Sequence, residues 1–233
     1  MRRMAGLLVL AMCAALCSAA QDLRQAAPQF VKVEYEDARV RVVRLRIPPN
    51  ASLPVHDRPA RVVIPLTTSV VRMNRADGSA ANVRSVAGTA IWSGPGRRSF
   101  TNLDAPLENI IVEVKNAKEP AKPLAQPPMP HPAGYLDEPF HHWLFENQYV
   151  RVYDVHVPAG ATTAFHEHAF DTVFVEISGG LEAAQPQGGA WEKPRKTIAG
   201  EVAFSPDAAH HRVHRVRNEA ASEYHVIAVQ LLP

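Results

Sequence analysis

Cysteine is nearly absent from this sequence: the 233 residues include two, Cys13 and Cys17. Both fall within the first twenty residues, where a short positive start is followed by an apolar stretch and a small-x-small sequence that ends at Ala20. This order predicts a signal peptide over residues 1–20 and an exported protein, periplasmic or extracellular. Cleavage after Ala20 removes both thiols, so disulfides and thiolate metal sites are excluded from the mature chain.

Long hydrophobic runs and an excess charge of one sign are also missing. The apolar stretch before Ala20 is shorter than the roughly 20 residues that a membrane-spanning helix needs, and no later stretch is a better candidate, so we expect no membrane span after cleavage. The 25 basic and 23 acidic side chains include no long basic run, which leaves nucleic-acid binding without support. A hydrophobic content of 46% predicts a globular protein with a core.

Histidine, by contrast, is plentiful and unevenly placed. Only His56 of the 11 histidines lies before residue 131. Between the two halves, residues 116–139 hold seven prolines, a density typical of an extended linker. We therefore expect a domain over residues 21–115, a linker over residues 116–138 and a second domain over residues 139–233.

The two expected domains resemble each other in sequence. With an offset of 110, residues 30–66 align with residues 140–176 without a gap, and nine of the 37 aligned positions are identical. The match resumes later at a slightly larger offset, where Asn102 aligns with Asn218. This internal repeat predicts two copies of one fold.

Both copies consist of short β-branched runs separated by turn residues. Outside the predicted signal peptide, no segment shows the 3.6-residue hydrophobic period of an amphipathic helix. Closely spaced strands of this kind predict an all-β fold with a sandwich or barrel in each half. The clearest strand candidates are residues 40–47, 62–71, 150–157 and 172–177.

The halves differ in charge. Residues 21–115 have 14 basic and 9 acidic side chains, against 7 basic and 11 acidic ones in residues 139–233. Opposed charges favour packing of the two halves, or of two chains, against each other. The charges are therefore compatible with a homodimer as well as with contact between the two halves of one chain.

The second copy contains a histidine pair with metal-ligand spacing. His166 and His168 directly precede the expected strand at residues 172–177. Alternate side chains of an extended chain point to the same face, so both imidazoles are expected to face one ion. A later segment supplies further histidines, among them His211 and His214.

This combination resembles the cupin superfamily, whose first motif runs Gly-x5-His-x-His-x3-Glu-x6-Gly and whose second runs Gly-x5-Pro-x-Gly-x2-His-x3-Asn. The matching residues are Gly160, His166, His168, Gly179, Gly200, Pro206, His214 and Asn218. The resemblance implies an exported bicupin with two cupin-like barrels, of the double-stranded β-helix or jelly-roll type. It also implies a metal held by His166, His168 and His214, and a small-molecule enzyme such as a dioxygenase, isomerase or decarboxylase.

Two departures from the motifs bear on the metal. Thr172 stands where the family has its metal-binding Glu, and the second motif is stretched. Counting from its start makes His211 the third ligand, whereas counting back from its end makes it His214, which also aligns with Arg98 of the first copy and is therefore favoured. Three imidazoles suit Zn, Fe, Cu or Ni, while Mn and Mg prefer the missing carboxylate. Polar neighbours are expected to hold the imidazole tautomers, and the candidates are Glu167, Asp171, Thr172 and Glu176.

The first copy retains one imidazole of the three. His56 remains, while Arg58 and Arg98 replace the other two, so no transition-metal site is expected there. These three side chains either form a pocket for a carboxylate or phosphate or lie on a solvated barrel rim.

Three interpretations of the function follow. In the first, the C-terminal barrel is a metal-dependent enzyme acting on a small molecule. In the second, the protein is a non-catalytic part of the cell envelope that binds a metal or a small ligand, and in the third it is a metal-free structural bicupin. The sequence contains no nucleophile motif, phosphate-binding glycine loop or dinucleotide fingerprint that would select a reaction.

Overall fold

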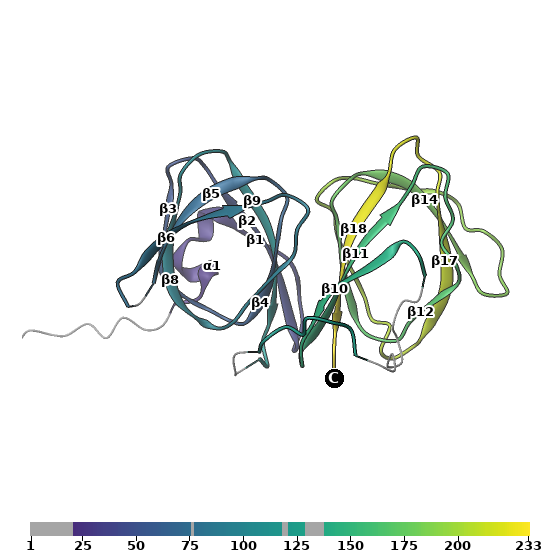
Figure 1. Cartoon of the computed structure of the whole chain (residues 1–233), viewed down its shortest axis with the longest axis horizontal. Coiled ribbons are helices and arrows are strands. Elements are labelled where there is room, and N and C mark those ends of the chain that lie inside the picture. The colour runs from purple at the N-terminus through teal and green to yellow at the C-terminus, as the bar shows by residue number, and fades with distance from the viewer. Residues whose placement is uncertain (1–20, 76, 118–120, 129–137) are drawn as a thin grey trace, which may run out of the picture.

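A computed structural model describes residues 21–75, 77–117, 121–128 and 138–233. The predicted signal peptide lies outside these residues. The regular secondary structure of the described chain is almost all β-strand, and the strands form two barrels, one in each half (Figure 1). The expected all-β fold with a barrel in each half is confirmed. None of the helices in the described part of the chain is long and apolar enough to cross a membrane.

The N-terminal barrel follows two short helical turns, α1 (Leu23–Ala26) and η1 (Pro28–Phe30). Its strands are β1 (Val31–Glu36), β2 (Val40–Ile47), β3 (Ser52–Arg58), β4 (Arg61–Pro65), β5 (Ser69–Arg75), β6 (Ala80–Ser85), β7 (Ile91–Ser93), β8 (Gly96–Asn102) and β9 (Leu107–Val114). They form two antiparallel sheets, with the strand orders β1-β2-β9-β4-β7 and β3-β8-β5-β6.

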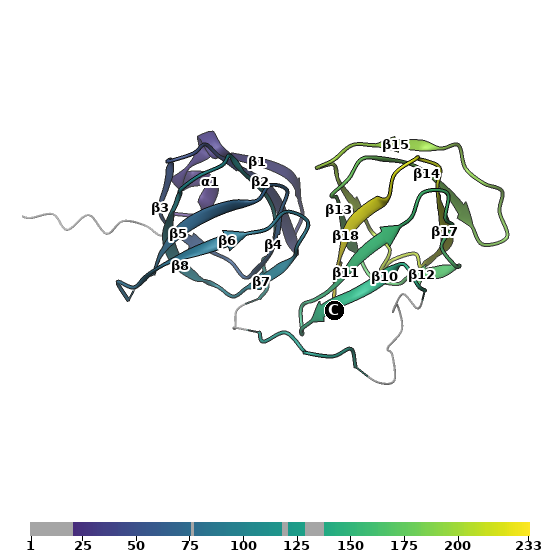
Figure 2. The ribbon, with the colours of Figure 1, turned by 45° about the horizontal axis from the view of Figure 1, so that its top comes forward.

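The C-terminal barrel repeats this arrangement. Its strands are β10 (His141–Glu146), β11 (Val150–Val157), β12 (His166–His168), β13 (Thr172–Glu176), β14 (Gly180–Pro186), β15 (Arg195–Thr197), β16 (Val202–Ser205), β17 (Arg212–Asn218) and β18 (Tyr224–Leu231). Their orders are β10-β11-β18-β13-β16 and β12-β17-β14-β15. Each strand takes the place of the strand nine numbers earlier, so both barrels have one topology (Figure 1 and Figure 2).

Three of the four predicted strands are confirmed and one is wrong. β2 and β11 have the bounds expected for residues 40–47 and 150–157, and β13 matches residues 172–177 to within one residue. The run at residues 62–71 is instead divided between β4 and β5, which belong to different sheets. Pro65 ends β4 because it has no N–H to donate, and the hydroxyl of Thr67 then accepts a bond from the backbone N–H of Glu108 at 2.8 Å.

Equivalent asparagines close the same turn in both barrels. The side-chain amide of Asn102, at the end of β8, donates to the carbonyls of Ile47, Pro48 and Ala105 at 2.8–3.2 Å. The amide of Asn218, at the end of β17, donates to the carbonyls of Val157, Pro158 and Ser222 at 2.8–3.2 Å. Both side chains are fully buried.

The barrels pack against each other through their five-stranded sheets. One continuous apolar cluster joins Val42 and Val112 of the first barrel to Val152 and Val175 of the second. Tyr35 stacks on Phe204 at 4.1 Å between ring centroids. We call this contact the barrel junction. Because strand side chains alternate, the odd-numbered residues of β2 and β11 face the interiors of their own barrels, in separate clusters.

Candidate metal centre

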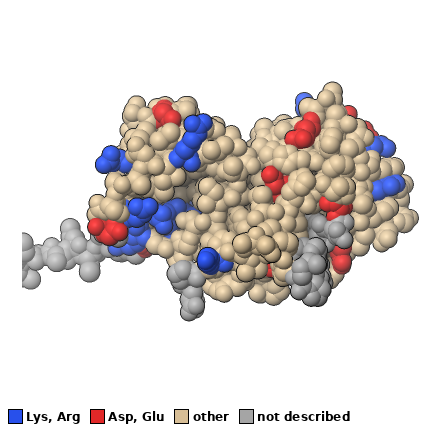
Figure 3. Space-filling view, in the orientation of Figure 1, with Lys and Arg blue, Asp and Glu red and all other residues tan. Residues whose placement is uncertain are grey.

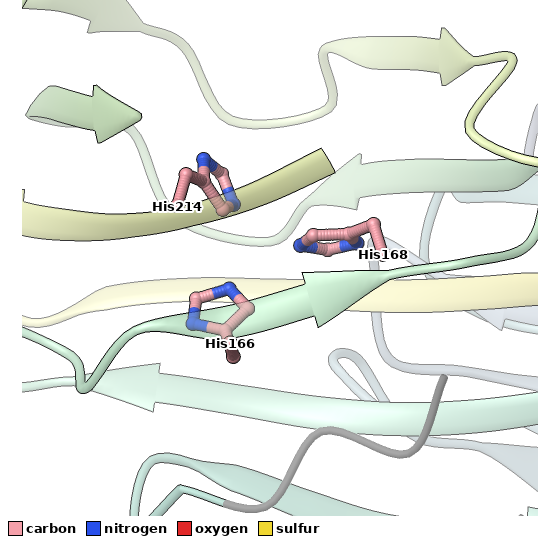
Figure 4. Close-up of side chains that lie close together, drawn as sticks. All are labelled: His166, His168 and His214. Carbon is pink, nitrogen blue, oxygen red and sulfur yellow. The ribbon is translucent and has the colours of Figure 1, made fainter. Parts of the chain in front are cut away.

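Three histidines of the C-terminal barrel meet on two paired strands. His166 and His168 lie on β12 with one residue between them, and β17 places His214 directly opposite His166. The ring centroids are 4.8–5.1 Å apart, and one nitrogen of each ring lies within 4.8 Å of the others. Figure 4 shows one nitrogen of each ring turned toward the space between the three rings. The sequence-predicted triad is therefore assembled, and all three side chains are buried.

The surroundings of His166 and His168 fit a metal centre, while His214 Nδ1 lies 3.2 Å from Arg212 Nη1. His166 Nδ1 lies 2.9 Å from the carbonyl oxygen of Ala164, which fixes the tautomer that leaves Nε2 free for an ion. His168 Nδ1 is buried and has no hydrogen-bond partner, as expected of a donor atom whose partner is an ion. A divalent cation would give each ring a partner in the space that they enclose.

The three imidazoles are neutral at pH 7. Burial is the largest cause, and it lowers the pKa of His166 to about 4, with a further contribution from His141. Burial and the nearby Arg212 lower the pKa of His214 to about 2. The pKa of His168 is also well below its ordinary value, chiefly through burial and the neighbouring His214. Neutral imidazole is the form that binds metals.

A fourth histidine, His141, lies beside the triad, and the sequence analysis did not include it in the site. Its ring centroid is 4.6 Å from that of His166, and its Nδ1 bonds to the carboxylate of Glu138. The β10–β11 register sets His141 opposite Val155, which faces the barrel interior. The side of the strand on which His141 lies is therefore fixed by the pairing of β10 with β11, which the sequence alone does not show.

A cavity of about 330 Å³ opens beside the triad. Apolar side chains such as Val155 and Phe174 form part of its lining, and the charged part includes Glu176, Glu182 and Arg195. A mixed lining of this kind is typical of small-molecule sites.

Of the four polar residues that were expected to hold the imidazole tautomers, Glu176 lines this cavity. Tyr224 donates a hydrogen bond to Oε1 at 2.9 Å, while the buried Oε2 has no partner. Burial raises the pKa of Glu176 to about 8. The carboxyl group therefore carries a proton at neutral pH, and it offers an O–H donor or a proton to a bound molecule.

The other three predicted tautomer-holding residues bond elsewhere. Glu167 lies between the two histidines of β12, so alternation turns it outward, where it pairs with the exposed His211 at 2.8 Å. Asp171 pairs with Arg39 at 3.2 Å, in the barrel junction. Thr172 is buried, and its hydroxyl donates to the carbonyl of Phe170 at 2.8 Å. None of the three bonds to a triad imidazole, and the alternative ligand His211 lies outside the triad.

The first barrel places arginines where the second has ligands. His56 of β3 lies opposite Arg98 of β8, just as His166 lies opposite His214. The Nη1 of Arg58 is buried without a partner. Burial and the neighbouring Arg61 and Arg98 lower the pKa of Arg58 to about 9. The structure thus brings the predicted anion-pocket residues together, and Figure 3 shows basic side chains gathered where Figure 1 labels β8.

Known proteins resemble this chain in structure. No family model and no curated protein matches the sequence. AerE from Microcystis aeruginosa superposes with a TM-score of 0.60 at 13% identity, over 87% of this chain and 97% of AerE. A cupin 2 conserved barrel domain protein from Leptotrichia buccalis gives 0.53 at 10% identity, over 86% of this chain and 88% of its own.

The fold is a cupin fold. Oxalate decarboxylase from Bacillus subtilis, a protein with Mn(II) centres, also superposes, with a TM-score of 0.54 at 14% identity, over 83% of this chain and 69% of its own. These shares of the chain are too large for one barrel, so the likeness extends over both cupin barrels. At such identities it concerns the fold alone, and the chemistry must be argued from the site.

Proposed function

We propose that this chain is an exported bicupin whose C-terminal barrel binds a divalent transition metal through His166, His168 and His214. The observation that supports it is the convergence of three buried, neutral imidazoles beside one cavity. Zn, Fe, Cu or Ni suit three nitrogen donors. Mn joins this set because the oxalate decarboxylase of similar fold has Mn(II) centres.

The cavity lining favours a small-molecule enzyme over a passive metal-binding protein. A divalent ion bound to the triad would polarise an oxygen atom of the substrate. Burial keeps the carboxyl group of Glu176 protonated near pH 7, and Tyr224 orients it by donating a hydrogen bond to Oε1, an arrangement suited to general acid–base catalysis. At about 330 Å³, the cavity lies at the lower end of the range for small-molecule sites. The substrate class that fits is a small oxygen-bearing molecule, as for a dioxygenase, isomerase or decarboxylase.

Elemental analysis of the protein beginning at Gln21 tests the metal site. After reconstitution under anaerobic conditions and removal of loose metal, we expect the double variant His166→Ala/His168→Ala to contain one equivalent less than the wild type. His214→Ala should lose the same equivalent. The exposed His211→Ala is the matched control and should retain it. Equal metal contents in the wild type and the double variant would exclude the triad as a metal site.

Export is tested separately, by expressing the chain from Met1 in a bacterial host and fractionating the cells. We expect a periplasmic or secreted product whose first residue is Gln21. A product that stays in the cytoplasm with residues 1–20 attached would contradict this part of the proposal.

A further inference from the structure

A second group of metal-binding side chains lies on the opposite face of the β10–β11–β18 sheet from the cavity. Asp154 and His156 belong to β11, and the register places His225 of β18 directly opposite His156. Asp154 Oδ1 lies 2.7 Å from His225 Nε2 and 3.1 Å from His156 Nε2. The two imidazoles stack with centroids 4.0 Å apart. One ligand atom from each of the three residues lies within 4.8 Å of the others.

Strand alternation explains why these side chains meet. Tyr153, Val155 and Val157 of β11 face the barrel interior, so Asp154 and His156 point to the other face. All three members of the group are partly exposed. An ion therefore reaches them without any opening of the barrel.

A further carboxylate orients one of the imidazoles. Glu223 Oε1 lies 2.8 Å from His156 Nδ1, and a carboxylate in this position holds the ring so that Nε2, which faces Asp154, is the atom available to an ion. His142 lies opposite Asp154 on β10, and its ring centroid is 6.0 Å from that of His156. A fourth donor is therefore near the group.

We propose that Asp154, His156 and His225 form a second divalent-metal site, which takes a Zn(II)-like ion through two imidazole nitrogens and one carboxylate oxygen. Two histidines and a carboxylate are an established donor set for zinc, with ligand bonds of about 2.0–2.2 Å. One ligand atom of each residue already lies within 4.8 Å of the others. An ion would replace the direct contacts of Asp154 with the two imidazoles, and small side-chain rotations would bring the three ligand atoms onto it. The fourth position is left to water or to His142.

The site lies at the edge of the barrel junction. A Cβ atom placed on Gly88 of the first barrel would lie 3.2 Å from Cε1 of His225 and 3.4 Å from Ile177. The first barrel therefore backs the His225 ring and restricts its rotation. An ion bound there would rest against the contact between the barrels and would stabilise it.

Zn(II) titration of the His166→Ala/His168→Ala variant tests this inference without interference from the triad. We expect one remaining equivalent by isothermal calorimetry, and a loss of at least ten-fold in affinity on adding Asp154→Asn. His211→Ala, which removes an exposed histidine paired with Glu167 on the same barrel, is the matched control and should leave the affinity unchanged. Binding that is absent from the double variant, or that is indifferent to Asp154→Asn, would overturn the second site.

The single variants Asp154→Asn and His225→Ala in the wild-type chain protect the test against misfolding of the combined variant. Each single variant should reduce the metal content from two equivalents per chain to one, with an unchanged circular dichroism spectrum. The test can contradict the triad site and the second site independently. The first metal depends on His166 and His168, and the second depends on Asp154 and His225. A wild-type content of one equivalent that Asp154→Asn does not alter would contradict the second site alone.

Discussion

The identity of single side chains decides what each barrel can bind. Both barrels pair a histidine of one strand with a residue directly opposite on the next, and that residue is His214 in one barrel and Arg98 in the other. An imidazole offers a lone pair to a cation, whereas a guanidinium has only donors and a fixed positive charge. The same backbone position therefore offers a candidate metal ligand in one barrel and a cationic hydrogen-bond donor in the other.

Arg58 leads to a prediction about the first barrel. Its guanidinium is close to Arg61 and Arg98, and its buried Nη1 has no hydrogen-bond partner, whereas Arg61 pairs with Glu113 at 3.2 Å. Burial of part of a cation without a partner destabilises the folded state. In a buffer without oxoanions we expect Arg58→Met to raise the free energy of unfolding by about 1 kcal/mol, measured by urea denaturation.

The anion pocket itself is tested in the same series. Inorganic phosphate should raise the melting temperature of the wild type and have a smaller effect on Arg58→Met. Arg97→Met is the control, because Arg97 is 51% exposed and pairs with Asp57, and we expect it to change stability by less than about 0.5 kcal/mol. Equal responses to phosphate in all three proteins would favour the solvated-rim interpretation.

Glu176 predicts a pH dependence of stability. Its pKa is about 8 in the folded protein and about 4.3 in an unfolded chain. Between these values the folded state holds a proton that the unfolded state has released, so its stabilising contribution is complete below about pH 4 and is lost as the pH rises through 8. Relative to Glu176→Gln, the metal-free wild type should lose on the order of 3 kcal/mol between pH 5 and pH 8.5.

Urea denaturation of the chelator-treated proteins at several pH values measures this difference. Glu192→Gln is the control, since Glu192 lines the same cavity but is exposed, and its stability should follow that of the wild type at every pH. Parallel curves for the wild type and Glu176→Gln would show that Glu176 titrates normally.

At the scale of elements, local sequence patterns carried much of the prediction. Runs of β-branched residues located β2 and β11, and alternation placed His166 and His168 on one face. The sequence contains a signal for the split of residues 62–71 in Pro65, which ends β4. The run nevertheless predicts one strand because Thr67 beyond it has the β-branched side chain of a strand residue, although Thr67 serves as an acceptor in the turn. His141 was missed for a related reason, since its face is set by pairing with β11.

The turn that Asn218 closes joins β11 to the segment that leads into the triad. Replacing Asn218 by Ala leaves the carbonyls of Val157, Pro158 and Ser222 without their donor. We expect the free energy of unfolding to fall by about 2–3 kcal/mol, measured by urea denaturation. Asn102→Ala should have a similar effect in the first barrel.

The exposed Asn82→Ala, in β6, is the matched control for both variants, and its effect should stay below about 0.5 kcal/mol. If Asn218→Ala were as stable as the control, the three hydrogen bonds would contribute little beyond what water supplies.

At the scale of the whole molecule, the opposed charges of the two halves contribute less to the barrel junction than apolar packing does. The charge difference predicted an attraction, and the ion pair between Arg39 and Asp171 at 3.2 Å is one instance of it. The continuous valine-rich cluster is the larger component, because burial of apolar surface is the main favourable term in association. The sequence did not reveal this face, since its valines are indistinguishable from those of each barrel interior.

That shared apolar layer has a consequence for how the chain is held together. The barrels contact each other through their sheets, so their association does not rest on the covalent connection alone. We expect a chain cut within residues 116–138 to stay together as two associated pieces, equivalent to a dimer of single-barrel proteins. The homodimer left open by the sequence would therefore have to use a different surface, since the sheet face suited to pairing is occupied within each molecule.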